Sequence, residues 1–331
     1  MTRRVLVVLT DAGAFGLTQS GREAMGLGCN LAAALDSHVE VAVLASADSE
    51  AAKEAGESGA ERILALDLGL PIDGDSLLTA VELAVREARA EVVVVNRGPN
   101  VLDLVPRLAA RLRGGCVMGV TEVRVVGEDI EAVAAIFGGC ARAVYRFSNN
   151  GPRVISGAPG VAAAPERKHG RTADVVVITS LPGSKQRVQV VESPRPAPEG
   201  RRLEDARVVV SGGRGLRDAE NYVLIRGLAA ALGGMPGASR AIVDDGWAPS
   251  AEQVGLTGRV VSPQVYLAFG ISGASQHMAG CSNSKTIVAV NTDPNAPIFR
   301  YAHYGIADDC LAVLPELIRL IGDRAAPDGS E

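Results

Sequence analysis

The chain has 331 residues, of which 47% are hydrophobic, 21% charged and only 3% aromatic, and its formal net charge is −5. This length suits two domains, each with its own core. The mild acidic excess and the scarcity of aromatic residues disfavour nucleic acid or an anionic membrane as the main partner, because phosphates attract cations and unpaired bases stack on aromatic rings.

The N-terminus carries two arginines before an apolar run that is too short for a signal peptide. No run approaches the roughly 18 uninterrupted apolar residues of a membrane-spanning helix. The five cysteines include no CxxC pair, which disfavours a structural zinc site and fits a reducing compartment. We therefore expect a cytoplasmic protein without membrane insertion and without a metal site.

The first half of the chain alternates short β-branched runs with alanine- and leucine-rich stretches. The run EVVVVN is typical of a parallel strand covered on both faces, so we predict a doubly wound α/β domain. The expected strands are Val5–Leu9, Val39–Leu44, Arg62–Ala65 and Glu91–Asn96, and the expected helices are Gly21–Leu35, Ser46–Gly56, Ser76–Ala90 and Asp103–Leu112.

The rhythm changes after Val117, where strand-like runs follow one another without helical stretches between them. An antiparallel extension of the same domain is the simplest interpretation. The runs are Val120–Val126, Ile130–Ile136, Ala143–Phe147, Val154–Ser156 and Val175–Thr179.

A stretch rich in proline and charge, SPRPAPEGRRLED, separates this region from a second α/β unit that begins with Arg207–Val210. We predict an N-terminal domain over residues 1–192, a linker over 193–205 and a C-terminal domain over 206–325.

Three strands of the second unit end in glycine-rich or polar loops. These loops are GGRG, the stretch Ser272–Ala274 before a helix expected near Ser275, and Asn291–Asp293. In an open parallel sheet, ligands bind beyond the carboxyl ends of the strands. Glycines let a pyrophosphate approach the backbone, and helix N-termini offer N–H groups. Together the loops predict a site for a nucleotide-type ligand.

The same region carries a specific combination of motifs. The runs SGGRGL, GASRAIVDDGWAPSAEQVGLTGRVVSPQVYLAFGISGASQHMAG, NTDPNAPIF and YGIADD extend with almost no gaps from about Val208 to Leu317. They resemble the C-terminal domain of the electron-transfer flavoprotein alpha subunit, and the N-terminal part of the chain is compatible with that family.

The resemblance implies a flavodoxin-like or Rossmann-like parallel-sheet domain that binds FAD. It also implies a beta subunit that completes the flavin's surroundings in a heterodimer. Such a pair is an electron carrier and not an enzyme: it accepts electrons from flavoprotein dehydrogenases, as in fatty acid β-oxidation, and passes them to a quinone oxidoreductase or another acceptor. A bifurcating complex driven by NADH stays open, because the second flavin would belong to the beta subunit.

The resemblance also assigns roles to individual residues. Arg214 would contact the FAD phosphates, and Ser239 and Arg240 would lie beside the isoalloxazine, where a guanidinium favours developing negative charge. The Thr257 hydroxyl would reach flavin N5, and His277 would donate to the flavin O2 carbonyl. Ser272, Gly273 and Ala274 would line the cofactor chain, Asn291 and Asp309 would hold the adenosine end, and further contacts are expected from Val254, Gly255, Leu256, Ser275, Gln276 and Cys310.

Each assignment has a plainer alternative. Arg214 could be a solvated turn residue, and Arg240 could form an ion pair with Asp244 or Asp245. His277 could be a helix-start residue satisfied by the backbone, and Thr257 could cap a turn. Asp308 and Asp309 could exchange roles, and Trp247 is expected to pack rather than touch the flavin.

Some positions depart from the family pattern. Leu256 replaces the usual glutamine of VGQTG, and His303 replaces an aspartate before YG. Ser275 and Met278 stand where larger or branched aliphatic residues are commoner. These changes indicate a divergent branch whose dehydrogenase partner need not be an acyl-CoA dehydrogenase.

Two other functions are weighed against electron transfer. The same fold could bind NAD in an enzyme, with His277 as the catalytic histidine, or serve as a non-redox nucleotide-binding regulatory module. Two surfaces are considered for the partner subunit, the antiparallel extension after Val117 and the loop Val161–Arg171.

Overall fold

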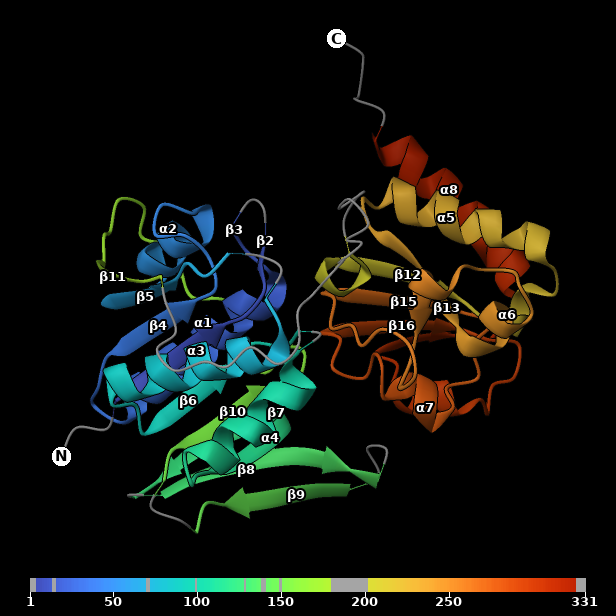
Figure 1. Ribbon diagram of the computed structural model, residues 1–331. Helices are drawn as coiled ribbons and strands as arrows, with labels where there is room; N and C mark the ends of the chain where they lie inside the picture. The colour runs from blue at the N-terminus through green and yellow to red at the C-terminus, as the bar shows by residue number, and fades with distance from the viewer. Residues whose placement is uncertain are drawn as a thin grey trace. The chain divides into compact units, whose positions relative to one another are not determined.

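The chain divides into two units, residues 1–195 and 196–331, each built around one large sheet. The computed structural model describes residues 4–13, 16–69, 72–98, 100–127, 129–137, 141–148, 151–179 and 202–325 (Figure 1). The expected domain boundary after residue 192 and most of the expected linker over 193–205 lie outside these residues. The linker's last residues form a short 3-10 turn, Leu203–Asp205.

A parallel core of four strands organises the first unit. The strands β1 (Val5–Leu9), β4 (Val39–Val43), β5 (Arg62–Leu66) and β6 (Val92–Val95) lie in the order β5-β4-β1-β6. One apolar core packs this sheet against α1 (Gln19–Ala34) and α2 (Glu50–Glu57), and a second packs the other face against α3 (Gly74–Ala88) and α4 (Val101–Arg111). The short strands β2 (Ala12–Gly13) and β3 (Gly16–Leu17) pair beside it. The predicted doubly wound domain is confirmed.

The strands after α4 form the predicted antiparallel extension only in part. The strands β7 (Gly115–Val126), β8 (Asp129–Ile136) and β9 (Ala141–Arg146) pair antiparallel in succession. However, β10 (Arg153–Gly157) runs parallel to both β6 and β7 and lies between them, and β11 (Asp174–Ile178) runs parallel to β5 at the opposite edge. The prediction was wrong for these two strands. In β10, Val154 and Ile155 are fully buried, as suits a strand covered on both faces.

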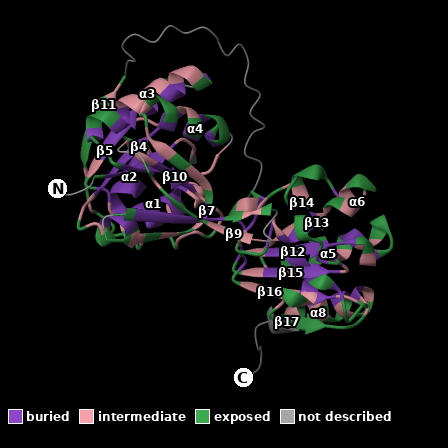
Figure 2. Ribbon diagram, turned by 90° about the horizontal axis from the view of Figure 1, so that it is seen from below, coloured by how far each residue is buried: buried purple, intermediate pink, exposed green. Residues whose placement is uncertain are grey.

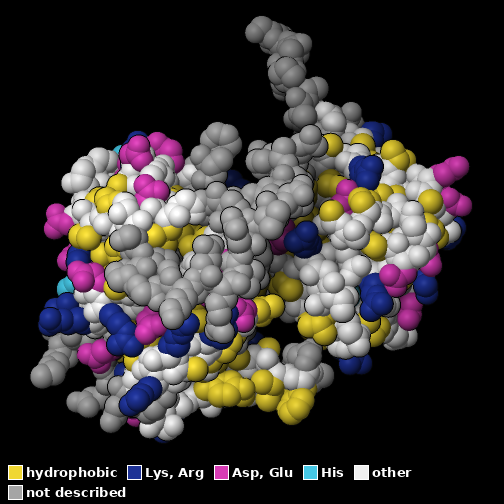
Figure 3. All heavy atoms as spheres, viewed as in Figure 1, with side chains coloured by type: hydrophobic (Ala, Val, Ile, Leu, Met, Phe, Trp, Pro, Cys, Tyr) yellow, Lys and Arg dark blue, Asp and Glu magenta, His cyan; other side chains and the backbone are white. Residues whose placement is uncertain are grey.

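The extension exposes apolar side chains. Figure 3 shows hydrophobic side chains gathered over the β8–β9 region on the face in view. The exposed large hydrophobic residues of the β7–β9 region are Val126, Phe137, Val144 and Tyr145, and Phe137 is 81% exposed. An apolar surface of this kind marks a place where another protein can bind.

The second unit is a parallel six-stranded sheet in the order β14-β13-β12-β15-β16-β17. When its strands are numbered by their order in the chain, they lie across the sheet in the order 3-2-1-4-5-6. This is the Rossmann order, one of the two parallel-sheet types that were expected. The order reverses between β12 and β15, so the ligand crevice is expected at their carboxyl ends. The strands are β12 (Val208–Gly212), β13 (Met235–Ser239), β14 (Gln253–Val254), β15 (Val265–Phe269), β16 (Thr286–Val290) and β17 (Tyr304–Ile306).

Helices cover one face of this second sheet. The helices α5 (Tyr222–Ala231) and α8 (Cys310–Ala325) pack on it around Val210, Phe269 and Leu314. On the other face, Tyr266 and Ile298 belong to a core covered by loops (Figure 2 shows the buried interior of β12 and β15). Two short helices, α6 (Arg240–Asp244) and α7 (Ser275–Met278), follow β13 and β15. The remaining 3-10 turns are Arg214–Leu216, Ala219–Asn221, Ser250–Glu252 and Pro297–Arg300.

Among the described residues, no helix is both long and apolar enough to cross a bilayer.

Candidate functional site

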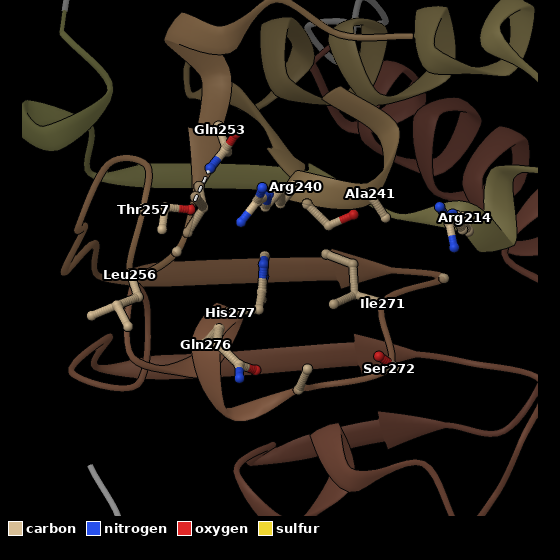
Figure 4. Close-up of a pocket in the computed structure, with 15 residues that line it drawn as sticks. Arg214, Arg240, Ala241, Gln253, Leu256, Thr257, Ile271, Ser272, Gln276 and His277 are labelled. Carbon is tan, nitrogen blue, oxygen red and sulfur yellow. Dashed lines mark hydrogen bonds between the residues drawn. The ribbon is translucent and has the colours of Figure 1, made fainter. Parts of the chain in front are cut away.

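A pocket of about 550 Å³ opens at the carboxyl ends of β12, β13 and β15 (Figure 4). This volume lies in the range of small-molecule sites, and the position agrees with the reversal of strand order between β12 and β15. The residues that line it are Arg214, Ser239, Arg240, Ala241, Gln253, Val254, Gly255, Leu256, Thr257, Gly270, Ile271, Ser272, Ala274, Gln276 and His277.

Glycine packing brings the loops after β12 and β15 together. A β carbon on Gly215 would lie 2.5 Å from Gly270 Cα, and one on Gly213 would lie 2.4 Å from the Gly270 carbonyl oxygen. The loop after β16 joins them, because Asn291 Nδ2 donates to the Ile271 carbonyl at 2.9 Å. The three predicted loops therefore meet at one edge of the sheet, and the pocket stays open beside the contact.

Two arginines stand on the rim of the pocket. Arg240 Nε donates to Asp244 at 3.1 Å, and Arg214 Nε donates to Asp245 at the same distance. Both side chains are about two-thirds exposed, and no hydrogen bond from their terminal Nη atoms is seen within the described part of the chain. The ion pair considered for Arg240 is present. It engages only Nε, so the outer nitrogens stay available to a ligand.

His277 supplies a buried, neutral group beneath the rim. Its side chain is among the buried polar residues, and its Nε2 lies 2.9 Å from the Tyr266 hydroxyl. Burial lowers the pKa of His277 to about 4, against a smaller raising effect of the Val254 carbonyl. Its buried Nδ1 makes no hydrogen bond within the described residues. The ring therefore has a side-chain partner in Tyr266 and the Val254 carbonyl nearby, so the alternative of a histidine satisfied by the backbone stays open.

The loop after β14 forms the end of the pocket that lies away from Arg214. Gln253 Nε2 donates to Thr257 Oγ1 at 3.1 Å, which leaves the hydroxyl proton of Thr257 free to point elsewhere. The Leu256 side chain is 58% exposed, whereas its N–H donates to the Gln276 carbonyl. Figure 4 shows Thr257 and Leu256 at one end of the pocket and Arg214 at the other, with Arg240 and His277 between them.

The lining includes most of the residues predicted from the sequence. Gly273 and Ser275 are chain neighbours of lining residues. Asn291, Asp309 and Cys310 lie outside the lining: Asp309 forms an ion pair with Arg217 at 2.7 Å, and Cys310 Sγ donates to the Gly215 carbonyl at 3.3 Å. Sequence reasoning missed four lining residues, and adjacency to a motif position was the only signal for them: Ala241, Gln253, Gly270 and Ile271.

Several further sequence interpretations concern residues away from the pocket lining. Trp247 packs against the core beneath α5 and α8, as expected. His303 Nδ1 accepts a hydrogen bond from the Ile287 N–H at 3.0 Å, so this departure has a structural role between β16 and β17. Within the described residues, no group of three or more His, Cys, Asp or Glu side chains is arranged to hold a metal ion.

Comparison with known proteins covers both units. Residues 5–181 match the family described as "Electron transfer flavoprotein domain", and residues 202–282 match "Electron transfer flavoprotein FAD-binding domain". The electron transfer flavoprotein subunit alpha of Thermoanaerobacterium thermosaccharolyticum is 39% identical over 249 residues, 73% of this chain and 74% of that protein. Protein FixB of Clostridium saccharobutylicum is 34% identical over 84% of each chain. The mitochondrial subunit alpha of Arabidopsis thaliana is 37% identical over 69% of this chain and 62% of its own length.

Proposed function

This chain belongs to the alpha-subunit family of electron-transfer flavoproteins, and we propose that the pocket at the carboxyl ends of β12, β13 and β15 is where it holds FAD. The protein is an FAD-binding electron carrier rather than a catalytic enzyme. Bound FAD supplies the chemistry by taking up and releasing electrons, while the chain positions the cofactor and sets its electrostatic surroundings.

The observation that carries this placement is the chemistry of the lining. The residues that match the FAD-binding family form a pocket with two arginines and with no aspartate or glutamate in its lining. Each arginine pairs through Nε with an aspartate outside the lining, so its outer nitrogens can still donate to phosphates and to negative charge on a reduced ring. The buried, unpartnered His277 Nδ1 lies beneath the rim. A cofactor carbonyl would satisfy that nitrogen, so the residues present fit the group.

The dinucleotide would lie lengthwise in the pocket, with its phosphates at one end and its flavin ring at the other. Arg214 would hold the phosphates, with Ser272, Gly273 and Ala274 along the connecting chain. Figure 4 supports this order, because Arg214 and Ser272 lie at the end away from Thr257. Asn291, Asp309 and Cys310 would then serve the adenosine end beyond the pocket lining.

The flavin end would lie between Arg240 and His277. Arg240 would place positive charge beside the isoalloxazine. The Thr257 hydroxyl, with one lone pair engaged by Gln253, would donate its proton to flavin N5. The surrounding contacts would come from Ser239, Val254, Gly255, Leu256, Ser275 and Gln276.

Membership of the family implies a heterodimer with a beta subunit. We favour the β7–β9 extension as its contact surface, because Phe137, Val144 and Tyr145 expose apolar area there. The competing loop 161–171 is engaged within its own unit: Arg167 pairs with Glu57 at 2.6 Å, and the Lys168 N–H donates to the Glu57 carbonyl.

We further propose a cytoplasmic carrier that takes electrons from a flavoprotein dehydrogenase and delivers them to a quinone oxidoreductase or another acceptor. Fatty acid β-oxidation is one pathway of this kind. The exposed Leu256 at the pocket rim and the other departures from the family motif indicate a divergent branch, whose dehydrogenase need not be of the acyl-CoA class.

The decisive experiment is purification of the chain with its beta subunit, followed by a visible spectrum and titration with FAD, NAD and AMP. We expect a yellow complex that FAD stabilises far more than AMP does. A complex that stays colourless after FAD is added would overturn the proposal. Tighter binding of NAD would favour the enzyme, and full stabilisation by AMP alone would favour the regulatory module.

The placement of the cofactor is tested by matched arginine variants of that complex. Arg240→Gln should weaken FAD binding, whereas Arg259→Gln should not. Arg259 belongs to the same unit and is similarly exposed, but it pairs with Glu204 outside the pocket lining. Equal effects of the two substitutions would count against this pocket.

A further inference from the structure

Tyr266 lies beneath the pocket without lining it. It belongs to β15, its side chain is completely buried, and its hydroxyl lies 2.9 Å from His277 Nε2. The two rings are tilted by 53° with centroids 6.1 Å apart, so they meet through the polar atoms and do not stack. His277, which lines the pocket, therefore connects the Tyr266 hydroxyl to it.

Among the polar neighbours of the Tyr266 hydroxyl, His277 Nε2 is the strongest acceptor. Burial raises the pKa of Tyr266 well above its ordinary value, so the phenol keeps its proton. Its other polar neighbours are Ser211, which can donate to the phenol oxygen, and Cys281, whose sulfur is a weak acceptor and itself donates to the His277 carbonyl at 3.6 Å. Were His277 to donate from Nε2 instead, the buried Tyr266 O–H would have to exchange the imidazole nitrogen for the weaker thiol sulfur of Cys281, which is the costlier arrangement.

The direction of this bond fixes the imidazole proton. A neutral histidine carries one hydrogen, so an Nε2 that accepts from Tyr266 leaves that hydrogen on Nδ1. The Val254 carbonyl, which favours a proton on the ring, agrees with this tautomer. Nδ1 makes no hydrogen bond of ordinary geometry within the described residues, although the Val254 carbonyl lies nearby, so an N–H there can still donate to a further acceptor.

We propose that Tyr266 is a positioning residue that holds His277 as the neutral Nδ1–H tautomer, so that the pocket offers FAD a hydrogen-bond donor without adding a positive charge. The identity of the ligand rests on the function proposed above, whereas the tautomer does not. The pocket would then stabilise the cofactor in two ways. The arginines on its rim supply positive charge, and His277 beneath the rim, held by Tyr266, supplies a neutral hydrogen-bond donor.

The test uses the complete complex with the beta subunit, in which only the alpha chain carries ¹⁵N-labelled histidine. The ring-nitrogen resonances of His277 are recorded with FAD bound and after its removal, in the wild type, in Tyr266→Phe and in Tyr222→Phe. Tyr222 is a matched control because it is also a buried tyrosine, but its hydroxyl bonds to Glu252 at 2.6 Å and to the Gly237 carbonyl.

We expect a protonated Nδ1 and a bare Nε2 in the wild type and in Tyr222→Phe. Tyr266→Phe should give a mixture of tautomers and about fivefold to tenfold weaker FAD binding, the loss of about one hydrogen bond. A wild-type Nε2–H tautomer would overturn the inference, even if Tyr266→Phe fails to fold. An unchanged tautomer in a folded Tyr266→Phe would overturn it as well. A changed tautomer with unchanged FAD affinity would support the tautomer assignment and refute the contact proposed between His277 and the cofactor.

Discussion

Replacing Gly273 with alanine should displace the loop that carries Ser272, Ala274 and His277 into the pocket. Gly273 has φ of +84°, and a β carbon there would lie 2.3 Å from Ile298 N and 2.4 Å from Ile298 Cα. The left-handed conformation costs alanine about 1–2 kcal/mol. Overpacking against a backbone that cannot rotate away adds about 1–3 kcal/mol. Disturbing the Ile298 N–H bond to the Ser272 carbonyl costs about 1 kcal/mol more. We therefore expect a loss of about 3–6 kcal/mol in the free energy of unfolding.

Gly233→Ala is the control for the backbone term alone. Gly233 has φ of +62° at the end of α5, and a β carbon there would meet nothing within 4 Å, so about 1–2 kcal/mol is expected. Denaturant unfolding of the complex with the beta subunit measures both losses, and flavin fluorescence after dilution measures release of FAD. Only Gly273→Ala should bind FAD at least about tenfold more weakly, which corresponds to about 1.4 kcal/mol. Equal destabilisation by the two substitutions, or unchanged FAD binding by Gly273→Ala, would refute the reasoning.

Three further changes should give distinct readouts. Arg240→Gln should make the flavin potential more negative by on the order of 20–40 mV in a redox titration, because an exposed positive charge is worth about 1–2 kcal/mol to a reduced ring; Arg259→Gln should leave the potential unchanged. Gln253→Leu should weaken FAD binding about twofold to tenfold, because it releases the Thr257 hydroxyl. Gln264→Leu is the control, because Gln264 is exposed and its partner is Arg207. Equal losses of FAD affinity in the two variants would contradict this. His277→Gln should flatten the pH dependence of the free energy of unfolding between about pH 6.5 and pH 4. Burial lowers the folded-state pKa of His277 to about 4, so the unfolded chain takes up the proton first as the pH falls. The wild type therefore loses up to about 3 kcal/mol of its free energy of unfolding between about pH 6.5 and pH 4. A wild type with no such loss would argue against a neutral, buried ring.

The sequence predicted individual elements better than their arrangement. Four consecutive valines identified β6 as a covered parallel strand, and the glycine-rich ends of β12 and β15 identified the edge of the sheet where the pocket opens. The position of β10 between β6 and β7 was missed because residue pattern reports burial and not strand order. The run around Val154 and Ile155 contained the signal of a central strand, but nothing in it names the neighbours.

The same distinction applies to the pocket. Arg214, Arg240 and His277 were found from a motif, because a motif records which side chains a family places at a site. Gln253 was missed because its function depends on a hydrogen bond to Thr257 that only the folded loop reveals. Tyr266 stood in the same motif run, but no role was assigned to it. Its polar atom became visible as a functional group once the distance to His277 was known.

The exposed arginines on the rim of the pocket and the buried residues beneath it should influence the flavin to different degrees. Arg214 and Arg240 are exposed and already paired with aspartates, so solvent and those carboxylates screen their charges. His277 and Tyr266 are buried, where the lower local dielectric makes each hydrogen bond stronger and each unsatisfied donor more costly. A neutral donor in that environment discriminates between redox states through one oriented bond. Substitutions of His277 or Tyr266 should therefore alter the flavin potential and its hydrogen bonding with little dependence on salt. Substitutions of the rim arginines should shift the potential by less as ionic strength rises.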